Sequence, residues 1–333
     1  MDSCDKMTRR VAIITGTIGS NTLSETIRSV NAQTVPVEHW IVIDGPEHDH
    51  GARRLVEKSP APPSNITRIV FTLPRNTGGS GYLCHRINAA VPWLVDAEYV
   101  CFLDDDNLIA PNHVERLLAS LAATPNAAWA YAHRTIIDVD GTVVCKDNCE
   151  SLGSMTHTVL GADDRHIDTN CYMISRDLAR QISPFWNARA RQSDQMEADR
   201  QVCRILLRHE PIHGVSPEYS VMYRVSRRLD SVAKDFFLQG NAILGRAVGG
   251  YDAARPTVYV FDTDPNTTAA LCHGILSDGH QHPWQFDEAH GANVCDGFAN
   301  APFLPPGATC VFLNGAHAHA KAPVRPDLST RIM

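Results

Sequence analysis

The sequence contains no apolar run long enough to cross a membrane and no excess of positive charge. A transmembrane helix needs about 20 consecutive apolar residues, and no stretch of this chain approaches that length. With 30 Lys and Arg against 37 Asp and Glu, the formal net charge of −7 argues against nucleic acid or an anionic membrane as a partner. The first ten residues are polar, so we expect no secretory signal.

A disulfide framework is also lacking, because the ten cysteines have no spacing typical of one. Some of them, such as Cys101 and Cys171, stand inside apolar runs, where a reduced cysteine packs as a small core residue. Cys145 and Cys149 are four positions apart, but no second ligand pair follows at the spacing of a structural zinc site. We therefore expect reduced cysteines and a cytoplasmic protein.

What the sequence does contain is an alternation of strand and helix patterns. Four strand-like apolar runs occupy residues 11–14, 40–43, 69–73 and 99–103, separated by helix patterns or polar loops. This order predicts an α/β fold with a parallel, doubly wound sheet, in which ligands bind beyond the carboxyl ends of the strands. After residue 125 the pattern becomes mixed, and from about residue 257 it consists of short strands and loops.

The most informative stretch is the acidic run Asp104-Asp105-Asp106, followed by Asn107, between the fourth strand pattern and a helix pattern. Carboxylates gathered at a strand end repel one another, and a hard cation such as Mg²⁺ or Mn²⁺ removes that repulsion while it shares phosphate oxygens with them. The alternative is a solvated turn that caps the next helix. We favour the metal site, because the other strand patterns also end in polar or glycine-rich segments that a parallel sheet brings to the same edge.

Taken in order, these parts resemble the family-2 glycosyltransferases with the GT-A fold. The resemblance covers about the first two hundred residues and rests on these segments: Thr15-Gly16-Thr17, residues 23–34 ending in Gln33-Thr34, the strand before Asp44-Gly45, residues 76–86, and Asp104 to Asp106. It implies residues 1–125 as the nucleotide-sugar donor half and residues 126–250 as the acceptor-side half with the catalytic base. Residues 251–333 are then a strand- and loop-rich C-terminal accessory region.

The resemblance further implies a nucleotide-diphosphate sugar donor, usually UDP-linked, a Mn²⁺ or Mg²⁺ ion, and a hydroxyl acceptor such as a glycan. Matched by position, the expected donor-binding residues are Thr15, Gly16, Thr17, Asp44, Gly78, Gly79, Arg86, Asp104 and Asp105. Arg224 is a further expected donor contact, because with His213, Arg227 and Arg228 it can close over the diphosphate and offset its charge; the alternative is a solvated basic face over residues 223–228. The expected metal ligands are Asp106, as the principal one, with Asp104 and His213. The chain departs from the common family pattern at Pro46 and Asn107, which leaves the subfamily open.

Transfer with inversion also needs a carboxylate that takes the proton of the acceptor hydroxyl. The resemblance places this base at the acidic start of a helix, and residues 197–206 are the best match. We expect Asp199 to be the base because it directly precedes the apolar helix face, with Glu197 as the second catalytic candidate and Asp194 as a third. The other interpretation is an acidic residue favoured by the helix dipole. Residues 168–170 are expected to form the floor of the acceptor site.

Two other functions are compatible with parts of this pattern. A nucleotidyltransferase also binds a nucleotide and Mg²⁺, but it normally carries a lysine in the loop after its first strand, and residues 15–19 have none. A catalytically silent nucleotide-sugar binder is the second alternative. In the histidine-rich C-terminal region, His280, His282 and Glu288 resemble a metal site, and residues 305–307 follow at a distance similar to that in cupins. A cupin would need a further histidine near Cys310, and none is there. We expect this region to form surface loops, to help bind the acceptor or to mediate homo-oligomer formation.

Overall fold

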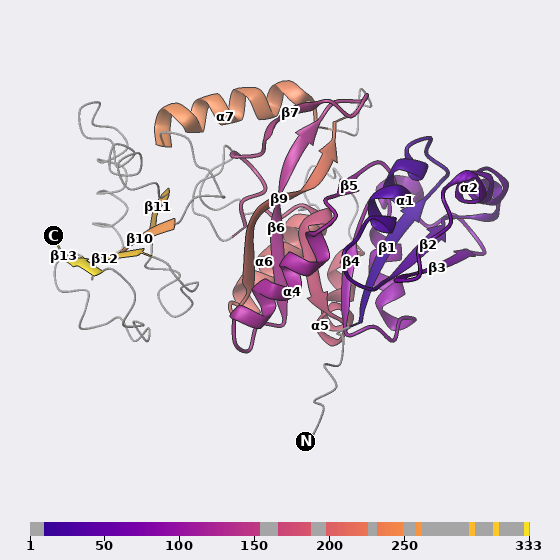
Figure 1. Ribbon diagram of the computed structural model, residues 1–333, viewed down its shortest axis with the longest axis horizontal. Coiled ribbons are helices and arrows are strands. Elements are labelled where there is room, and N and C mark those ends of the chain that lie inside the picture. Colours follow the sequence, from indigo (N-terminus) through magenta and orange to yellow (C-terminus); the bar gives the residue numbers. More distant parts are fainter. Residues whose placement is uncertain are drawn as a thin grey trace, which may run out of the picture.

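The computed structural model describes residues 10–153, 166–187, 198–225 and 232–248, and four short strands beyond them. Its centre is a nine-stranded sheet with the strand order β3-β2-β1-β4-β8-β6-β9-β5, to which β7 adds by pairing with β6 (Figure 1). The strands are β1 (Val11–Thr17), β2 (Val37–Ile43), β3 (Ile66–Thr72), β4 (Tyr99–Phe102), β5 (Leu108–Ile109), β6 (Trp129–Ile137), β7 (Val143–Lys146), β8 (Tyr172–Ser175) and β9 (Gly214–Arg224). The sheet is mixed and its first half is parallel, so the predicted α/β fold is confirmed.

The parallel half consists of β1 to β4 and the helices between them. These helices are α1 (Leu23–Asn31), α2 (Pro46–Lys58) and α3 (His85–Ala90). Helix α1 follows from its pattern, since Leu23, Ile27 and Val30 share one face and are buried. Helix α2 lies where the sequence shows only a polar stretch. Because Ala52 is its single buried residue, there is no apolar period from which to predict it.

The second half begins where β8 pairs antiparallel with both β4 and β6. Strand β9 then runs parallel to β6, and the short β5 closes that edge. The helices of this half are α4 (His113–Ala123), α5 (Arg176–Ile182), α6 (Ala198–His209) and α7 (Lys234–Val248). Both halves therefore belong to one continuous sheet, and a single large apolar core runs from Val11 and Val42 to Tyr172 and Val202.

Short 3₁₀ turns connect several of these elements. They are η1 (Gly79–Gly81), η2 (Val91–Trp93), η3 (Thr169–Cys171) and η4 (Ser183–Trp186). Turn η3 leads directly into β8 and lies beside the end of β4, which the acidic run follows. Its first residues thereby reach the acidic run.

A second sheet is formed by β10 (Thr257–Phe261), β11 (Asn293–Asp296), β12 (Thr309–Phe312) and β13 (Thr330–Ile332), all parallel, in the order β11-β10-β12-β13. It agrees with the expectation of short strands after residue 257. The residues of the predicted histidine-rich feature, His280, His282 and Glu288, lie outside the described part of the chain. None of the helices that the structure describes combines the length and the apolar character that crossing a bilayer requires.

Candidate active site

A cavity of about 360 Å³ opens beside the carboxyl ends of the parallel strands, and both halves of the sheet contribute to its wall. From the first half it is lined by Gly16, Thr17, Asp44, Gly78 and Asp104 to Asp106, among others. From the second half come Arg134, Glu150, His166, Asp168, Asp199, Arg200, Tyr223 and Arg224. The structure thus gathers most of the residues that the sequence singled out, although they are up to two hundred positions apart.

Three predicted donor-binding residues lie behind or beside this wall. Thr15 is fully buried under the cavity, where its hydroxyl lies 3.1 Å from Nε2 of His39. The Gly79 amide donates to Asn76 at 2.9 Å. The Arg86 guanidinium covers the Tyr82 ring at 3.4 Å from its centroid and donates to Asn187. These contacts make the three residues part of the supporting structure of the cavity in this conformation.

Asp44, at the end of β2, holds the glycine-containing loop in place. Its Oδ1 accepts from the backbone N–H and the hydroxyl of Thr77 at 2.7 and 2.9 Å, and its Oδ2 accepts from the Gly78 N–H at 2.9 Å. A side chain at Gly78 would not fit, because a Cβ there would lie 2.4 Å from the Leu83 carbonyl oxygen. The loop therefore depends on both the carboxylate and the glycine.

The acidic run is shaped by bonds to its first two carboxylates. Asp105 accepts from the Thr17 hydroxyl, and its carbonyl accepts from Thr22 at 3.0 Å, which ties the run to the end of β1 and the start of α1. Asp104 accepts from the amide of Asn170 at 2.8 Å and from the Cys84 thiol at 3.2 Å. Burial, together with the nearby Asp168 carboxylate, raises the pKa of Asp104.

Asp106 is the carboxylate with the least compensation. Burial raises its pKa to about 7, and repulsion from Asp104 and Asp105 adds to this effect while Arg224 opposes it. A bound cation would relieve this repulsion. Within the described ranges no three His, Cys, Asp or Glu side chains are grouped to hold a metal ion by themselves. Mg²⁺-type sites that include a phosphate need only one or two protein carboxylates, so Asp106 with Asp104 fits such an ion.

Arg224, at the end of β9, contacts the acidic run through the backbone. Its Nε donates to the Asp106 carbonyl oxygen at 2.9 Å, its second nitrogen to the Val139 carbonyl at 2.9 Å, and its third to Glu25 in α1 at 2.6 Å. The side chain is only 4% exposed. It clamps β9, α1 and the acidic run together at the cavity wall. Arg227 and Arg228 lie outside the described residues.

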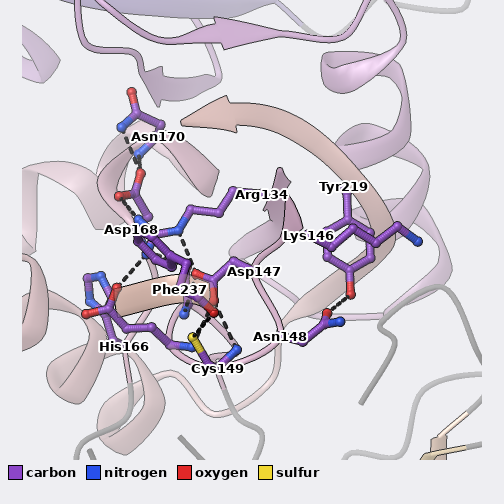
Figure 2. A network of polar contacts seen from close by, with 12 residues as sticks. Arg134, Lys146, Asp147, Asn148, Cys149, His166, Asp168, Asn170, Tyr219 and Phe237 are labelled. Carbon is purple, nitrogen blue, oxygen red and sulfur yellow. Dashed lines mark hydrogen bonds and ion pairs between the residues drawn. The ribbon is translucent and has the colours of Figure 1, made fainter. Parts of the chain in front are cut away.

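In the second half of the sheet a buried guanidinium meets three carboxylates (Figure 2). Arg134 in β6 contacts Asp147 at 2.8 Å, Glu150 at 2.6 Å and Asp168 at 2.5 Å. Burial lowers the pKa of Arg134, but the three carboxylates outweigh it and raise that pKa well above its usual value. The Tyr223 ring lies 4.4 Å from the guanidinium carbon. The guanidinium therefore stays charged, and its single positive charge is shared by three carboxylates.

Asp199, the residue predicted to be the base, lies in the first turn of α6 and lines the cavity. Its Oδ2 is 3.7 Å from Nε2 of His166, and its side chain is 23% exposed. Burial lowers the pKa of His166 well below its usual value, so this imidazole is neutral and does not hold the Asp199 carboxylate by charge. The other two candidates, Glu197 and Asp194, lie outside the described residues.

The expectation for His213 needs correction. It precedes β9 and stacks on Trp129 with ring centroids 4.4 Å apart, while its Nδ1 lies 2.7 Å from the Pro211 carbonyl. Burial lowers its pKa to about 4. The opposite end of β9 carries Arg224 and reaches the acidic run, and eleven strand residues span roughly 35 Å. We therefore remove His213 from the expected ligand set.

Sequence reasoning did not identify Arg134, Glu150, His166 or Arg200 as site residues. One signal was available for Arg134, since a charged residue inside a largely buried strand such as β6 must find buried partners. The sequence does not say which partners these are. The others lie in segments whose composition is ordinary for a surface loop or a helix face.

Comparison with known families identifies the chain. The profile of "Glycosyl transferase family 2" matches residues 13–182, which is half of the sequence, so the chain belongs to this family. The predicted resemblance is confirmed, and the assignment places the chain among glycosyltransferases rather than nucleotidyltransferases. A comparison with curated protein sequences gave no match.

Solved structures of TarS from S. aureus are similar in fold. TarS residues 1–349 match with 16% identity and a TM-score of 0.45 over 65% of this chain and 60% of the TarS chain. The same TarS fragment in complex with UDP-GlcNAc matches with 14% identity and a TM-score of 0.47 over 71% of this chain and 65% of the other. The matched part of this chain thus spans less than two thirds of the TarS chain.

Proposed function

We propose that this family-2 glycosyltransferase is a metal-dependent, inverting enzyme that moves a hexosyl group from a UDP-linked donor to a hydroxyl acceptor of the glycan class. The observation that carries the proposal is one cavity lined both by the acidic run, at the strand ends of the donor half, and by Asp199, from the acceptor half. Inverting transfer needs these two groups on one cavity: a place for the departing diphosphate and a carboxylate for the attacking hydroxyl.

The donor half supplies the nucleotide-binding groups in this proposal. Thr17, Asp44 and Gly78 line the cavity at the ends of β1 and β2 and in the loop after β3, and their hydrogen bonds keep the wall rigid. Asp106 and Asp104 would hold Mn²⁺ or Mg²⁺, which when bound supplies positive charge to the leaving diphosphate. Arg224 supports the run from behind through the Asp106 carbonyl.

Asp199 performs the proton transfer in this proposal. Its carboxylate accepts the proton of the acceptor hydroxyl while the hydroxyl oxygen attacks the anomeric carbon, and the bond from that carbon to the diphosphate oxygen breaks. The electron pair of the broken bond leaves with the diphosphate. Arg134, Glu150 and Arg200 keep this part of the wall fixed and charged, so that water is not needed to solvate it.

UDP release tests the function directly. The protein is incubated with UDP-hexoses, Mn²⁺ and a panel of neutral glycosides, and UDP and pyrophosphate are measured separately, with a chelator as control. We expect UDP release that requires both metal and acceptor. A parallel reaction contains UTP and hexose 1-phosphates, the substrates of a nucleotidyltransferase, and release of pyrophosphate there would contradict a glycosyltransferase. Tight donor binding without UDP release for any acceptor would instead favour a catalytically silent binder.

A further inference from the structure

The acidic run and the acceptor-side carboxylate lie in different halves of the sheet, yet a continuous series of hydrogen bonds joins them. It begins at Asn170 in η3, which holds Asp104 by two bonds. The Asn170 Oδ1 accepts from the Asp104 backbone N–H at 2.6 Å, and its Nδ2 donates to the Asp104 carboxylate at 2.8 Å. Asn170 is 1% exposed, so water does not compete for these bonds. The direction of the Asp104 carboxylate therefore depends on this amide.

Asp168 fixes the orientation of that amide. One of its oxygens accepts from both the backbone N–H and the Nδ2 of Asn170, at 2.9 and 2.7 Å. Its other oxygen accepts from Arg134 at 2.5 Å (Figure 2). Because a guanidinium is a planar fork with fixed donor directions, the position of Arg134 sets that of Asp168 and, through it, that of Asn170.

The same guanidinium reaches the base. Its second terminal nitrogen donates to Glu150 at 2.6 Å, and the other Glu150 oxygen accepts from Arg200 at 2.9 Å. Arg200 follows Asp199 in the first turn of α6, and its backbone N–H donates to Asp199 Oδ1 at 2.7 Å. Arg134 thus lies between two arms, one that ends at Asp104 and one that ends beside Asp199.

Stability alone is a poor explanation for this arrangement. Removing a guanidinium and three carboxylates from water costs free energy that their attraction offsets only in part, and apolar side chains of similar size often stabilise a core as well or better. Arg134 stands in a strand in which Tyr131, Ala132 and Ile136 are fully buried and apolar or aromatic. What apolar side chains would not provide is a fixed direction for the two carboxylates at the ends.

We propose that Arg134, Asp168, Asn170 and Glu150 form a positioning network that holds the Asp104 carboxylate and the first turn of α6 in one fixed geometry. This inference rests on the proposed function, in which the first end serves the donor metal and the second the acceptor base. These four residues act through Asp104 and Asp199 and do not themselves react.

Calorimetric titration of Mn²⁺ in the presence of UDP tests the arm of the network that ends at Asp104, which we call the donor arm. Asn170→Ala is expected to weaken Mn²⁺ binding by about 10- to 100-fold, the usual effect of losing a partner behind a metal ligand. Asn148→Ala is the matched control and should bind Mn²⁺ like the wild type, because Asn148 hydrogen-bonds Tyr219 in the same half and its contacts do not reach Asp104. Circular dichroism checks folding, and Asn170→Ser, too short to bridge both groups, serves as a second variant.

Glu150→Gln tests the arm of the network that ends beside Asp199, which we call the acceptor arm. It removes the charge that Arg134 and Arg200 share and leaves the bonds of Asn170 intact. We expect Mn²⁺ and UDP affinity to stay at the wild-type value while kcat for transfer falls by about 10- to 100-fold, because a misplaced base loses the reactive geometry.

Three results would overturn the network. They are normal Mn²⁺ binding in Asn170→Ala, an equal loss of Mn²⁺ affinity in Asn170→Ala and Glu150→Gln, and failure of both Asn170 variants to fold. The last two would show a structural role only. A wild-type protein without metal-dependent UDP binding is a separate result and would contradict the proposed function itself.

Discussion

At the scale of single residues, the distinguishing feature of this cavity is that its three consecutive aspartates do different work. The side chains of Asp104 and Asp105 accept hydrogen bonds from Asn170 and Thr17. The charged form of Asp106 is instead destabilised, by burial and by repulsion from its two neighbours, which raises its pKa. The carboxylate that gains most from a cation is therefore Asp106.

Asp106→Ala should remove the metal dependence of UDP binding, with a loss of at least about 100-fold in affinity at saturating Mn²⁺, since even partners behind a metal ligand are worth 10- to 100-fold. Calorimetry of UDP with and without Mn²⁺ measures it. Asp138→Ala is the control, because Asp138 lies in a surface turn and pairs with Lys234. An undiminished metal effect in Asp106→Ala would assign the ligand elsewhere.

Asp199 is the residue expected to act as the base. Asp199→Asn should keep donor binding and lower kcat by about 10²- to 10⁴-fold, because the amide has the shape of the carboxylate but cannot take a proton. Steady-state transfer and UDP titration measure the two effects. Glu197→Gln and Asp194→Asn are the comparison variants. If one of them is inactive while Asp199→Asn is active, the base is that residue; if all three are active, inverting transfer through a carboxylate of this segment is refuted.

At the scale of elements, the loop after β3 depends on close backbone packing. Gly78→Ala should lower the free energy of unfolding by about 1–3 kcal/mol, as overpacking usually does, because its Cβ would lie 2.4 Å from the Leu83 carbonyl oxygen. The same Cβ would lie 3.0 Å from Oδ2 of Asp44 and would disturb that carboxylate, so UDP binding should weaken. Urea denaturation and calorimetry measure the two effects.

Gly51→Ala in α2 is the matched control for this substitution. Nothing lies within 4 Å of a Cβ at Gly51, and the residue is exposed in the middle of a helix. Alanine should therefore stabilise the protein by about 0.5–1 kcal/mol through its helix propensity. Equal effects at the two positions would mean that the loop relaxes around the added methyl group.

At the scale of the whole molecule, the buried histidines predict acid sensitivity. Burial lowers the pKa of both His39 and His113 to about 3. In the unfolded chain each takes up a proton near pH 6.5, so their contribution to stability is fully present above that pH and is lost as the pH falls toward 3. Each histidine contributes a slope of about 1.4 kcal/mol per pH unit in this window.

His113→Gln should reduce that slope, and His50→Gln, an exposed histidine of α2, should leave it unchanged. Urea denaturation at a series of pH values between 6 and 4 gives the slopes. A wild-type slope in His113→Gln would mean that the histidine is protonated in the folded protein, contrary to its burial and its contact with Ser220 at 2.7 Å.

Much of the first half of the sheet follows from the sequence. Strands β1 and β4, and β2 from Trp40 onward, are apolar on both faces, so their patterns are local and their polar ends can be located without knowing what packs on them. Because parallel strands end at one edge, the place of Asp44 and of the acidic run followed as well. Helix α2 and strand β9 could not be predicted from the sequence. Helix α2 buries only one residue, and β9 has polar residues such as Ser216 and Glu218 within it, so neither shows a clear apolar pattern.

The buried charge pairs on the other side of the cavity, in the second half of the sheet, were decided by the tertiary structure. Arg134 meets carboxylates 13, 16 and 34 positions further along the chain, and Asn170 meets Asp104 across 66 positions. No local pattern encodes such pairings. A buried charge needs a partner, but the residues around it in the sequence do not indicate which distant residue that partner is. The apolar periods and strand ends determined where a donor and a metal are expected to bind. The folding of the mixed half against them decided which side chains complete the cavity from the second half of the sheet, since only close packing makes one charge the partner of another.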